Sequence, residues 1–288
     1  MAVLAHLSDP HLGPLPRTPW TALLNKRLSG FLSWQTKRRF LYQEEPRRAI
    51  LADLRAHAPG HIAVTGDLIN LSLRAEYPPA LNWLRRLGTA QEVSLVPGNH
   101  DCYVPVQPGK KAWAEYMGGD DFPYLRRWGE VALIGVTTAV PMPVFLAAGR
   151  MGQDQGERLR RLLRESRGLF RVVMMHHPPY GERRFWRKAL HDAAEFRAIV
   201  AAEGAELILH GHMHRTMMRT IPAAGKVCPV IGVASCAAVI SNHVEPAAYH
   251  LYDIARDGSG WLVQTRVRGL APHQSAVAER GRFTLRIA

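Results

Sequence analysis

Residues 1–11 of the chain read MAVLAHLSDPH, a short apolar run followed directly by Ser8, Asp9, Pro10 and His11. The apolar run predicts a buried strand, and Pro10 favours an extended turn immediately after it. Asp9 and His11 would therefore stand at the carboxyl end of that strand. Ligands bind beside the carboxyl ends of the strands in open α/β sheets, so this stretch predicts both the kind of fold and the position of a functional site.

The same arrangement recurs four times along the chain. Apolar runs precede Gly66-Asp67, Gly98-Asn99-His100-Asp101, His176-His177 and Gly211-His212-Met213-His214. Each cluster taken singly has an ordinary explanation as a turn or as packed histidines. Five clusters in succession, each after a predicted strand, are hard to obtain by chance, so we expect them to converge on one site.

Strand and helix patterns alternate through the first three quarters of the chain. Strands are predicted at 1–7, 61–65, 93–96, 131–136, 172–175 and 206–209, and helices at 46–57, 74–87, 155–167 and 190–203. This order predicts a largely parallel sheet covered by helices. After His214 only strand-like runs follow, and they predict a second, more antiparallel sheet. The expected fold class is α/β, a four-layer α-β-β-α sandwich of two mixed sheets flanked by helices, in a single domain over 1–288.

Composition limits the cellular locations and the partners that we expect for the protein. Three cysteines without CxxC spacing argue against a disulfide framework and a thiolate zinc site. No apolar run approaches the roughly 20 residues of a membrane-spanning helix, and no signal peptide is recognisable. We therefore expect a cytoplasmic protein, soluble or peripheral on the inner membrane face. The formal charge of +13 favours anionic partners such as phosphorylated metabolites, nucleic acid or an anionic membrane surface.

The residue types in the five clusters suit a pair of metal ions. Two divalent ions about 3.5 to 4 Å apart can hold the attacking and leaving oxygens of a phosphoryl displacement. Such a pair needs a bridging carboxylate, imidazoles and a neutral amide oxygen, and the clusters contain all three. Oxygen and nitrogen donors without a thiolate suit manganese, iron or zinc.

The motifs DxH, GD, GNHD, HH and GHxH, which span residues 9–214, resemble the calcineurin-like metallophosphoesterase superfamily. The resemblance implies that Asp67 bridges two metal ions. It implies that one ion is also held by Asp9, His11 and His214. It implies that the other is completed by Asn99, His176 and His212. We expect His177 to pack or hydrogen-bond nearby.

The resemblance also implies a catalytic pair outside the metal shell. His100 would bind phosphate or protonate the leaving oxygen, and Asp101 would orient it. A metal-activated hydroxide would attack phosphorus.

Departures from the superfamily's motifs narrow the subclass. Asn70 stands where purple acid phosphatases carry a metal-binding tyrosine, and GNHD differs from the GNHE of protein serine/threonine phosphatases. The remaining motifs resemble the bacterial phosphodiesterase branch, which includes class III cyclic-nucleotide phosphodiesterases and lipid A pathway pyrophosphohydrolases. This implies hydrolysis of a phosphodiester or pyrophosphate bond, with a cyclic nucleotide or a UDP-diacylglucosamine-like lipid as substrate. A nuclease is disfavoured because the basic residues form no long stripe, and a non-enzymatic scaffold because every ligand position is intact.

A basic insertion at about 15–45 follows the first motif. Trp20, Leu23, Leu24, Leu28, Phe31 and either Trp34 or Leu32 follow helical spacing, with Asn25, Lys26, Ser29, Ser33 and Lys37 on the other side, which predicts a basic amphipathic helix. One interpretation is a cap helix whose apolar side faces the core. The other is a surface helix that contacts anionic lipid or forms a wall of the active site.

Overall fold

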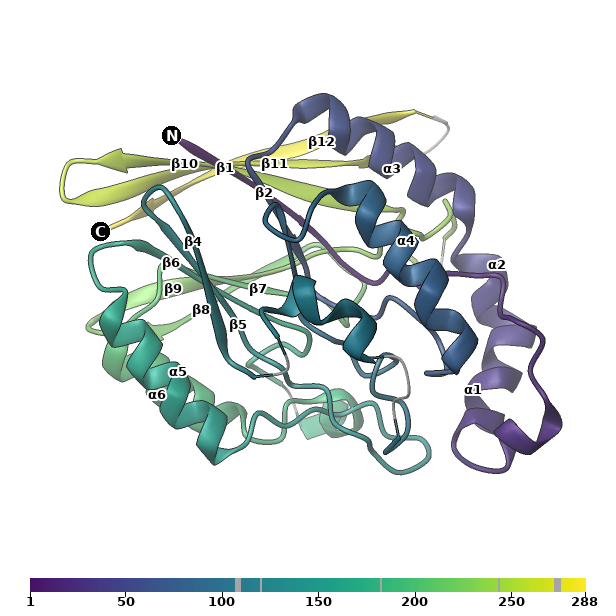
Figure 1. Ribbon diagram of the computed structural model, residues 1–288. Coiled ribbons are helices and arrows are strands. Elements are labelled where there is room, and N and C mark those ends of the chain that lie inside the picture. Colours follow the sequence, from purple (N-terminus) through teal and green to yellow (C-terminus); the bar gives the residue numbers. More distant parts are fainter. Residues whose placement is uncertain (107–109, 120, 182, 243, 272–275) are drawn as a thin grey trace.

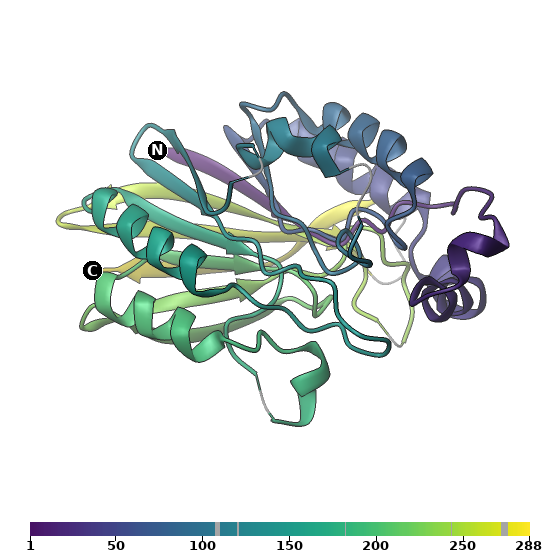
Figure 2. The ribbon, with the colours of Figure 1, turned by 60° about the horizontal axis from the view of Figure 1, so that its bottom comes forward.

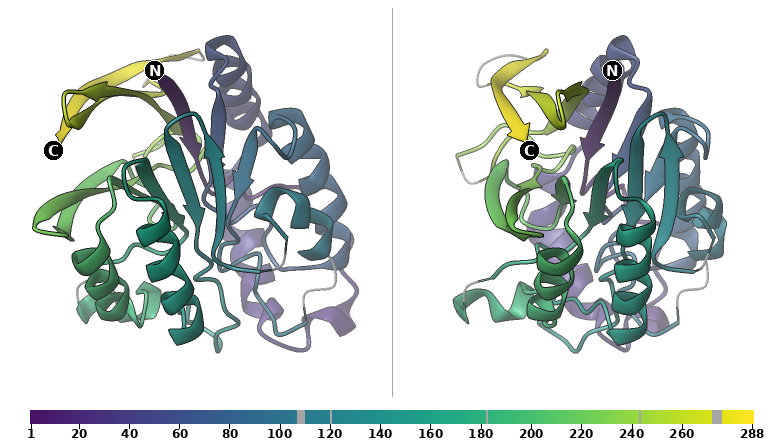
Figure 3. Two further views of the ribbon diagram at one scale, coloured as in Figure 1. Left: turned by 60° about the vertical axis from the view of Figure 1, so that its left-hand side comes forward. Right: turned by 90° about the vertical axis from the view of Figure 1, so that its left-hand side faces the viewer.

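Two sheets pack against each other at the centre of the molecule, between two pairs of helices (Figures 1 and 3). The computed structural model describes residues 1–106, 110–119, 121–181, 183–242, 244–271 and 276–288. The strands of the first sheet are β1 (Ala2–Leu7), β2 (His61–Val64), β3 (Val93–Leu95), β10 (Ala248–Asp257), β11 (Gly260–Leu270) and β12 (Val277–Ile287). Those of the second are β4 (Tyr124–Trp128), β5 (Val131–Gly135), β6 (Phe170–Met175), β7 (Leu207–His210), β8 (Met217–Ala223) and β9 (Lys226–Gly232).

Both sheets are mixed. The first has the order β12-β11-β10-β1-β2-β3, in which β1, β2 and β3 are parallel. β10 is antiparallel to β1, and β11 and β12 are each antiparallel to the strand before them. The second has the order β4-β5-β6-β7-β9-β8, in which only the edge strands β4 and β8 are antiparallel to their neighbours.

The strands after His214 do not form a sheet of their own, so that expectation was wrong. β8 and β9 extend the second sheet, and β10, β11 and β12 extend the first. Each parallel group has an edge whose backbone N–H and C=O groups need partners. The late strands supply these partners to both groups.

Helices cover the outer face of each sheet, as Figure 1 shows. α3 (Glu44–His57) and α4 (Tyr77–Leu87) lie on the first sheet, and α5 (Gln153–Glu165) and α6 (Ala193–Glu203) lie on the second. Alternate residues of a strand point to opposite faces. In β6, Val172 and Met174 accordingly face the core between the sheets, whereas Val173 and Met175 face α5 and α6. The predicted four-layer α-β-β-α sandwich is confirmed.

Among the described connections that follow α3 are the 3-10 helices η3 (Arg74–Glu76), η4 (Lys110–Met117) and η5 (Arg183–Lys188). Within the ranges given above, no helix has both the length and the apolar character needed to cross a membrane.

The insertion is a succession of short helices at the end of the molecule toward which β1 runs (Figure 2). It consists of η1 (Trp20–Leu23), α1 (Arg27–Ser33), the π-helical turn η2 (Trp34–Arg38) and α2 (Arg39–Leu41). Each residue of an α-helix turns by about 100° around the helix axis. The 3-10 and π-helical turns have a different rotation per residue, so the side chains of the insertion do not all point in the directions that regular α-helical spacing predicts. Phe31 and Trp34 pack inward, whereas Leu28 and Leu32 are exposed.

One ion pair fixes α3 to the first sheet. The Arg268 guanidinium on β11 donates to both oxygens of Asp53, at 2.6 and 2.7 Å, and the Tyr249 hydroxyl on β10 donates to the same carboxylate at 2.6 Å. Burial alone would raise the pKa of Asp53, but these hydrogen bonds and the Arg268 charge lower it.

We expect Asp53→Asn to lower the free energy of unfolding by about 1 to 2 kcal/mol at neutral pH, because a charge-assisted pair is lost. A carboxylate with a lowered pKa in the folded state stabilises above its unfolded pKa of about 4 and loses this contribution as the pH falls through the folded pKa. The difference between variant and wild type should therefore shrink in acid. Urea unfolding at several pH values measures it. Asp257→Asn, which removes an exposed pairing at 3.9 Å, is the control and should change little.

Candidate metal centre

The backbone takes an unusual conformation where the strands end. Asp9, His11, Asp67, His212 and His214 have φ angles of 54°, 40°, 56°, 66° and 52°. This left-handed region costs a residue with a side chain about 1 to 2 kcal/mol, and such residues persist where the surrounding structure holds them, often at functional sites. The conformation turns their side chains away from the direction of the strand.

Hydrogen bonds beyond the strand ends hold these turns. The Asp9 N–H donates to Gly66 O at 2.9 Å and the His11 N–H to Asp67 O at 3.1 Å, so the pairing of β1 with β2 continues into the two loops. The Ser235 hydroxyl donates to Asp9 O at 2.7 Å. The His212 N–H donates to Asp9 Oδ2 at 3.1 Å, which ties the loop after β7 to the loop after β1.

Two motif glycines are required by close approach. A Cβ on Gly98 would lie 2.2 Å from Asp67 Oδ1, and a Cβ on Gly211 would lie 2.0 Å from Ser8 Oγ. Neither distance is possible between nonbonded atoms. The glycines of GNHD and GHMH therefore let the loops come close enough for the acidic and imidazole groups to meet.

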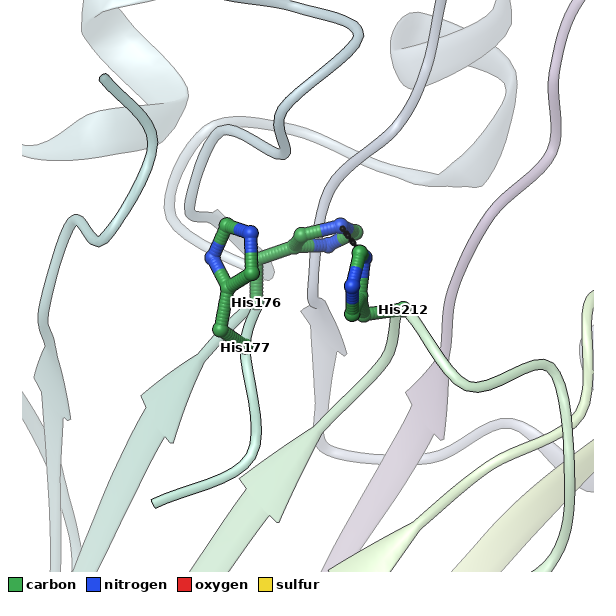
Figure 4. Close-up of side chains that lie close together, drawn as sticks. All are labelled: His176, His177 and His212. Carbon is green, nitrogen blue, oxygen red and sulfur yellow. Dashed lines mark hydrogen bonds between the residues drawn. The ribbon is translucent and has the colours of Figure 1, made fainter. Parts of the chain in front are cut away.

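Four atoms that could bind a metal ion lie close together, and one of them belongs to His176. Its Nε2 lies 3.1 Å from Asn99 Oδ1, 3.2 Å from His212 Nδ1 and 3.5 Å from Asp67 Oδ2. Figure 4 shows His176 and His212 pointing toward one another from the ends of β6 and β7. The Nδ1–H of His176 donates to Thr65 O at 2.7 Å, which leaves Nε2 free to bind a metal ion.

A second group of donors lies on the other side of Asp67. His214 Nε2 is 3.0 Å from Asp9 Oδ1 and 3.4 Å from His11 Nε2, and His11 Nε2 is 3.9 Å from Asp67 Oδ2. Ligand atoms of Asp9, His11, Asp67 and His214 all lie within 4.8 Å of one another. The structure therefore brings all seven predicted ligands together, and Asp67 Oδ2 adjoins both groups.

Electrostatics in the centre favour positive charge beside Asp67. Burial disfavours a charged His176, but the Asp67 carboxylate raises the pKa of this histidine to about 9. Burial would raise the pKa of Asp67 in turn, but His176 and His100 hold it well below its usual value. Burial keeps the pKa of His11 and His212 low, so these imidazoles are neutral and can act as ligands. Two acidic groups, four imidazoles and one amide fit two metal ions.

His177 lies beside His176 and His212, but both nitrogens of its ring form hydrogen bonds with other residues. Its Nε2–H donates to Ala147 O at 3.1 Å, and its Nδ1 accepts a hydrogen bond from the Thr138 hydroxyl at 2.8 Å. Both ring nitrogens therefore have partners, although the three histidines lie close enough to hold an ion. This agrees with the packing and hydrogen-bonding position expected for His177.

His100 lies beside the metal centre, but Asp101 has a different position from the one expected. The Nδ1–H of His100 donates to the backbone oxygen of Asn70 at 2.7 Å. The Asp101 carboxylate accepts hydrogen bonds from the backbone N–H groups of Asp67, Gly98 and Ile69. Asp101 thus fixes the loop that carries Asp67, and Asn70 orients His100.

Two residues of the insertion reach the site, and the sequence analysis did not single them out. The Tyr42 hydroxyl lies 2.7 Å from His214 Nδ1, and the Arg38 guanidinium contacts His11 and His100. After burial, Arg38 is the main cause of the lowered pKa of His11, and burial and Arg38 together lower the pKa of His100 to about 3. Arg38 stands in a run of basic residues, and only the three-dimensional structure separates it from Lys37 and Arg39.

Residues 2–216 match the model of the calcineurin-like phosphoesterase family. The chain belongs to this family, whose members hydrolyse phosphoric esters and depend on two metal ions. A probable cyclic nucleotide phosphodiesterase from Synechococcus sp. is similar at 24% identity over 219 residues, which cover 75% of this chain and 80% of the relative.

Solved structures share the fold. The purple acid phosphatase PPD1 from seeds of yellow lupin, Lupinus luteus, is similar with a TM-score of 0.62 and 11% identity over 98% of this chain. The match covers 53% of the lupin chain, so this protein spans about half of that enzyme. PhoD is similar with a TM-score of 0.61 and 9% identity, over 99% of this chain and 70% of PhoD.

We expect Asp67→Asn to abolish binding of both metal ions, because the shared carboxylate adjoins both groups of donors. Hydrolysis of a phosphodiester should fall by about 1,000-fold or more, equivalent to about 4 kcal/mol of transition-state stabilisation. Elemental analysis of the purified protein measures the metal. Asp154→Asn, at an exposed position of α5, is the matched control. A variant with two bound ions and wild-type activity would remove Asp67 from the centre.

Proposed function

We propose that the protein is a dinuclear-metal phosphodiesterase that hydrolyses a phosphodiester or pyrophosphate bond in a small phosphorylated substrate. The observation that carries this proposal is the position of Asp67 Oδ2, which adjoins His11 on one side and His176 on the other. A single carboxylate between two groups of imidazoles is the arrangement that two neighbouring cations need.

Each of the seven donors has an assigned place in the proposal. Asp9, His11, Asp67 and His214 would hold the first ion. Asp67, Asn99, His176 and His212 would hold the second. When bound, manganese, iron or zinc ions would activate water as the nucleophile and offset the charge on the phosphate oxygens.

His100 is proposed to bind the phosphate or to protonate the leaving oxygen. Its Nδ1–H is engaged with Asn70 O, which leaves Nε2 for the substrate. Because burial and Arg38 lower the pKa of His100, Nε2 gains the proton that it donates only when the negative charge of the phosphate lies beside it. Asp101 supports the reaction indirectly, because it holds the backbone of the loop that carries Asp67.

We expect His100→Ala to keep both metal ions and to lower kcat by about 100- to 10,000-fold, the usual contribution of a positioned acid or base. Metal content and thermal stability serve as internal controls for intact folding. An unchanged kcat would exclude His100 from proton transfer.

A cyclic nucleotide is the first candidate substrate, because the Synechococcus relative is named for this activity. Under this proposal the protein acts in the cytoplasm on a soluble nucleotide. Activity measured across cyclic nucleotides, nucleotide-linked lipids, glycerophosphodiesters and phosphomonoesters, each with added manganese, iron or zinc, tests the substrate class.

A second candidate is a nucleotide-linked lipid of the UDP-diacylglucosamine type, hydrolysed at the inner membrane face. The outward face of the insertion favours it. Trp20, Leu24, Leu28 and Leu32 are 72%, 72%, 49% and 54% exposed, although burial of such side chains would stabilise each by about 1.5 to 3 kcal/mol. Lys37 lies exposed on the same segment, and aromatic and basic groups together suit an anionic lipid surface.

If this second candidate is correct, the wild-type protein co-sediments with vesicles that contain an anionic phospholipid. The triple substitution of Trp20, Leu24 and Leu28 by Ser should reduce binding at least about tenfold, because the inserted apolar area is lost. Val227→Ser, at a 62% exposed position of β9, should bind as the wild type does. Wild-type protein that stays in the supernatant would leave the soluble nucleotide as the substrate.

A further inference from the structure

Arg38 extends from the insertion into the metal centre. Its Nη2 lies 2.7 Å from His11 Nδ1 and 3.1 Å from His11 Nε2, and its Nη1 lies 3.1 Å from His100 Nδ1. The guanidinium therefore lies between a candidate metal ligand and the candidate acid. Arg38 is the last residue of the π-helical turn η2, and π turns within helices occur frequently at functional sites.

The insertion is anchored on two sides, which fixes the position of Arg38. Arg27 donates to Leu71 O at 2.8 Å and to Ser72 O at 2.7 Å, in the loop after β2. Lys26 donates to Leu146 O at 2.8 Å, in the connection between β5 and α5. Trp34, four residues before Arg38, is only 4% exposed. Figure 2 shows that the insertion stands at the same end of the molecule as the loops that follow the strands.

The contacts of Arg38 leave its positive charge without a negative partner. His100 Nδ1 carries a hydrogen that it donates to Asn70 O, so it cannot accept one from Arg38. In the part of the chain that the structure describes, the hydrogen-bond contacts of this guanidinium are with imidazole nitrogens, and no carboxylate forms an ion pair with it. The Tyr42 ring lies 5.7 Å from the carbon of this guanidinium, so an anion supplied from outside the chain would be the first negatively charged partner of Arg38 among the described residues.

The proposed metal ions make this requirement stronger. Two cations held by the neighbouring donors would repel a guanidinium that contacts one of those donors. An anion placed between the metal centre and Arg38 removes the repulsion and is attracted by all three charges. A phosphoryl group fits, because the planar guanidinium can donate two parallel hydrogen bonds to its oxygens.

We propose that Arg38 is a phosphate-binding residue, which donates to the non-bridging oxygens of the substrate's phosphoryl group beside the metal ions. This inference rests on the proposed function and deepens it, because it gives the insertion a direct part in recognising the substrate. The phosphoryl group is held between the metal ligands, which follow strands of both sheets, and Arg38, which belongs to the insertion.

The test compares Arg38→Ala, Arg38→Gln and Arg38→Lys with Arg39→Ala. Arg39 is the matched control, because it is an exposed arginine next in sequence whose side chain contacts Gln35 and Phe40. Two quantities are measured on the manganese-loaded protein: the Kd of inorganic phosphate by calorimetry, and kcat/KM for bis(p-nitrophenyl) phosphate.

We expect Arg38→Ala and Arg38→Gln to weaken phosphate binding by about 10- to 100-fold, the usual effect of losing a hydrogen bond to a charged group, and to lower kcat/KM at least as much. Arg38→Lys should recover part of both losses, because it restores the charge without the planar fork. Arg39→Ala should match the wild type, and metal content should be unchanged in every variant.

Wild-type phosphate affinity in Arg38→Gln, with both manganese ions bound, would overturn the inference, and so would an equal loss in Arg39→Ala. Arg38→Gln keeps most of the side chain's length, so it gives an answer even where Arg38→Ala fails to fold. These results differ from a failure of the proposed function itself. In that case the wild-type protein would neither bind manganese nor hydrolyse any phosphodiester.

Discussion

The arrangement of the whole molecule depends on the position of one buried carboxylate. Asp67 Oδ2 must lie within reach of His11 and His176, which follow strands of different sheets. This requires the two sheets to pack with the carboxyl ends of β1, β2, β6 and β7 at the same end of the sandwich. The left-handed turns at these ends, and the glycines that allow the loops to touch, follow from the same requirement. The four layers of the fold hold two groups of donors at a fixed separation.

Much of this could be predicted from the sequence because the decisive signals are local. Each apolar run ends at a polar cluster, so the positions of Asp67, His176 and His212 follow from strand prediction alone. The division of the strands after His214 between the two sheets could not be predicted from local signals. β10 pairs with β1 although more than a hundred residues of chain separate the two strands, and β9 pairs with β7. The periodicity of a strand contains no information about which strand will be its partner.

Interactions made by backbone atoms could not be predicted from the sequence either. Asn70 orients His100 through its carbonyl oxygen, an atom that every residue possesses, so no residue type marks that function. Asp101 was expected to orient the imidazole because the resemblance implies it, but its carboxylate accepts hydrogen bonds from three backbone N–H groups. In the insertion, Arg38 is the last residue of a π-helical turn that begins at Trp34, and spacing rules for a regular helix cannot anticipate the direction of its side chain.

The pairing of β1 with β10 has a consequence for the synthesis of the protein. Asp9 leaves the ribosome more than two hundred residues before the Ser235 hydroxyl that holds its backbone and before β10, the strand that covers the edge of β1. Until then β1 presents an open edge to which other chains can add. The candidate metal centre therefore cannot take its final form until β10 has emerged and paired with β1.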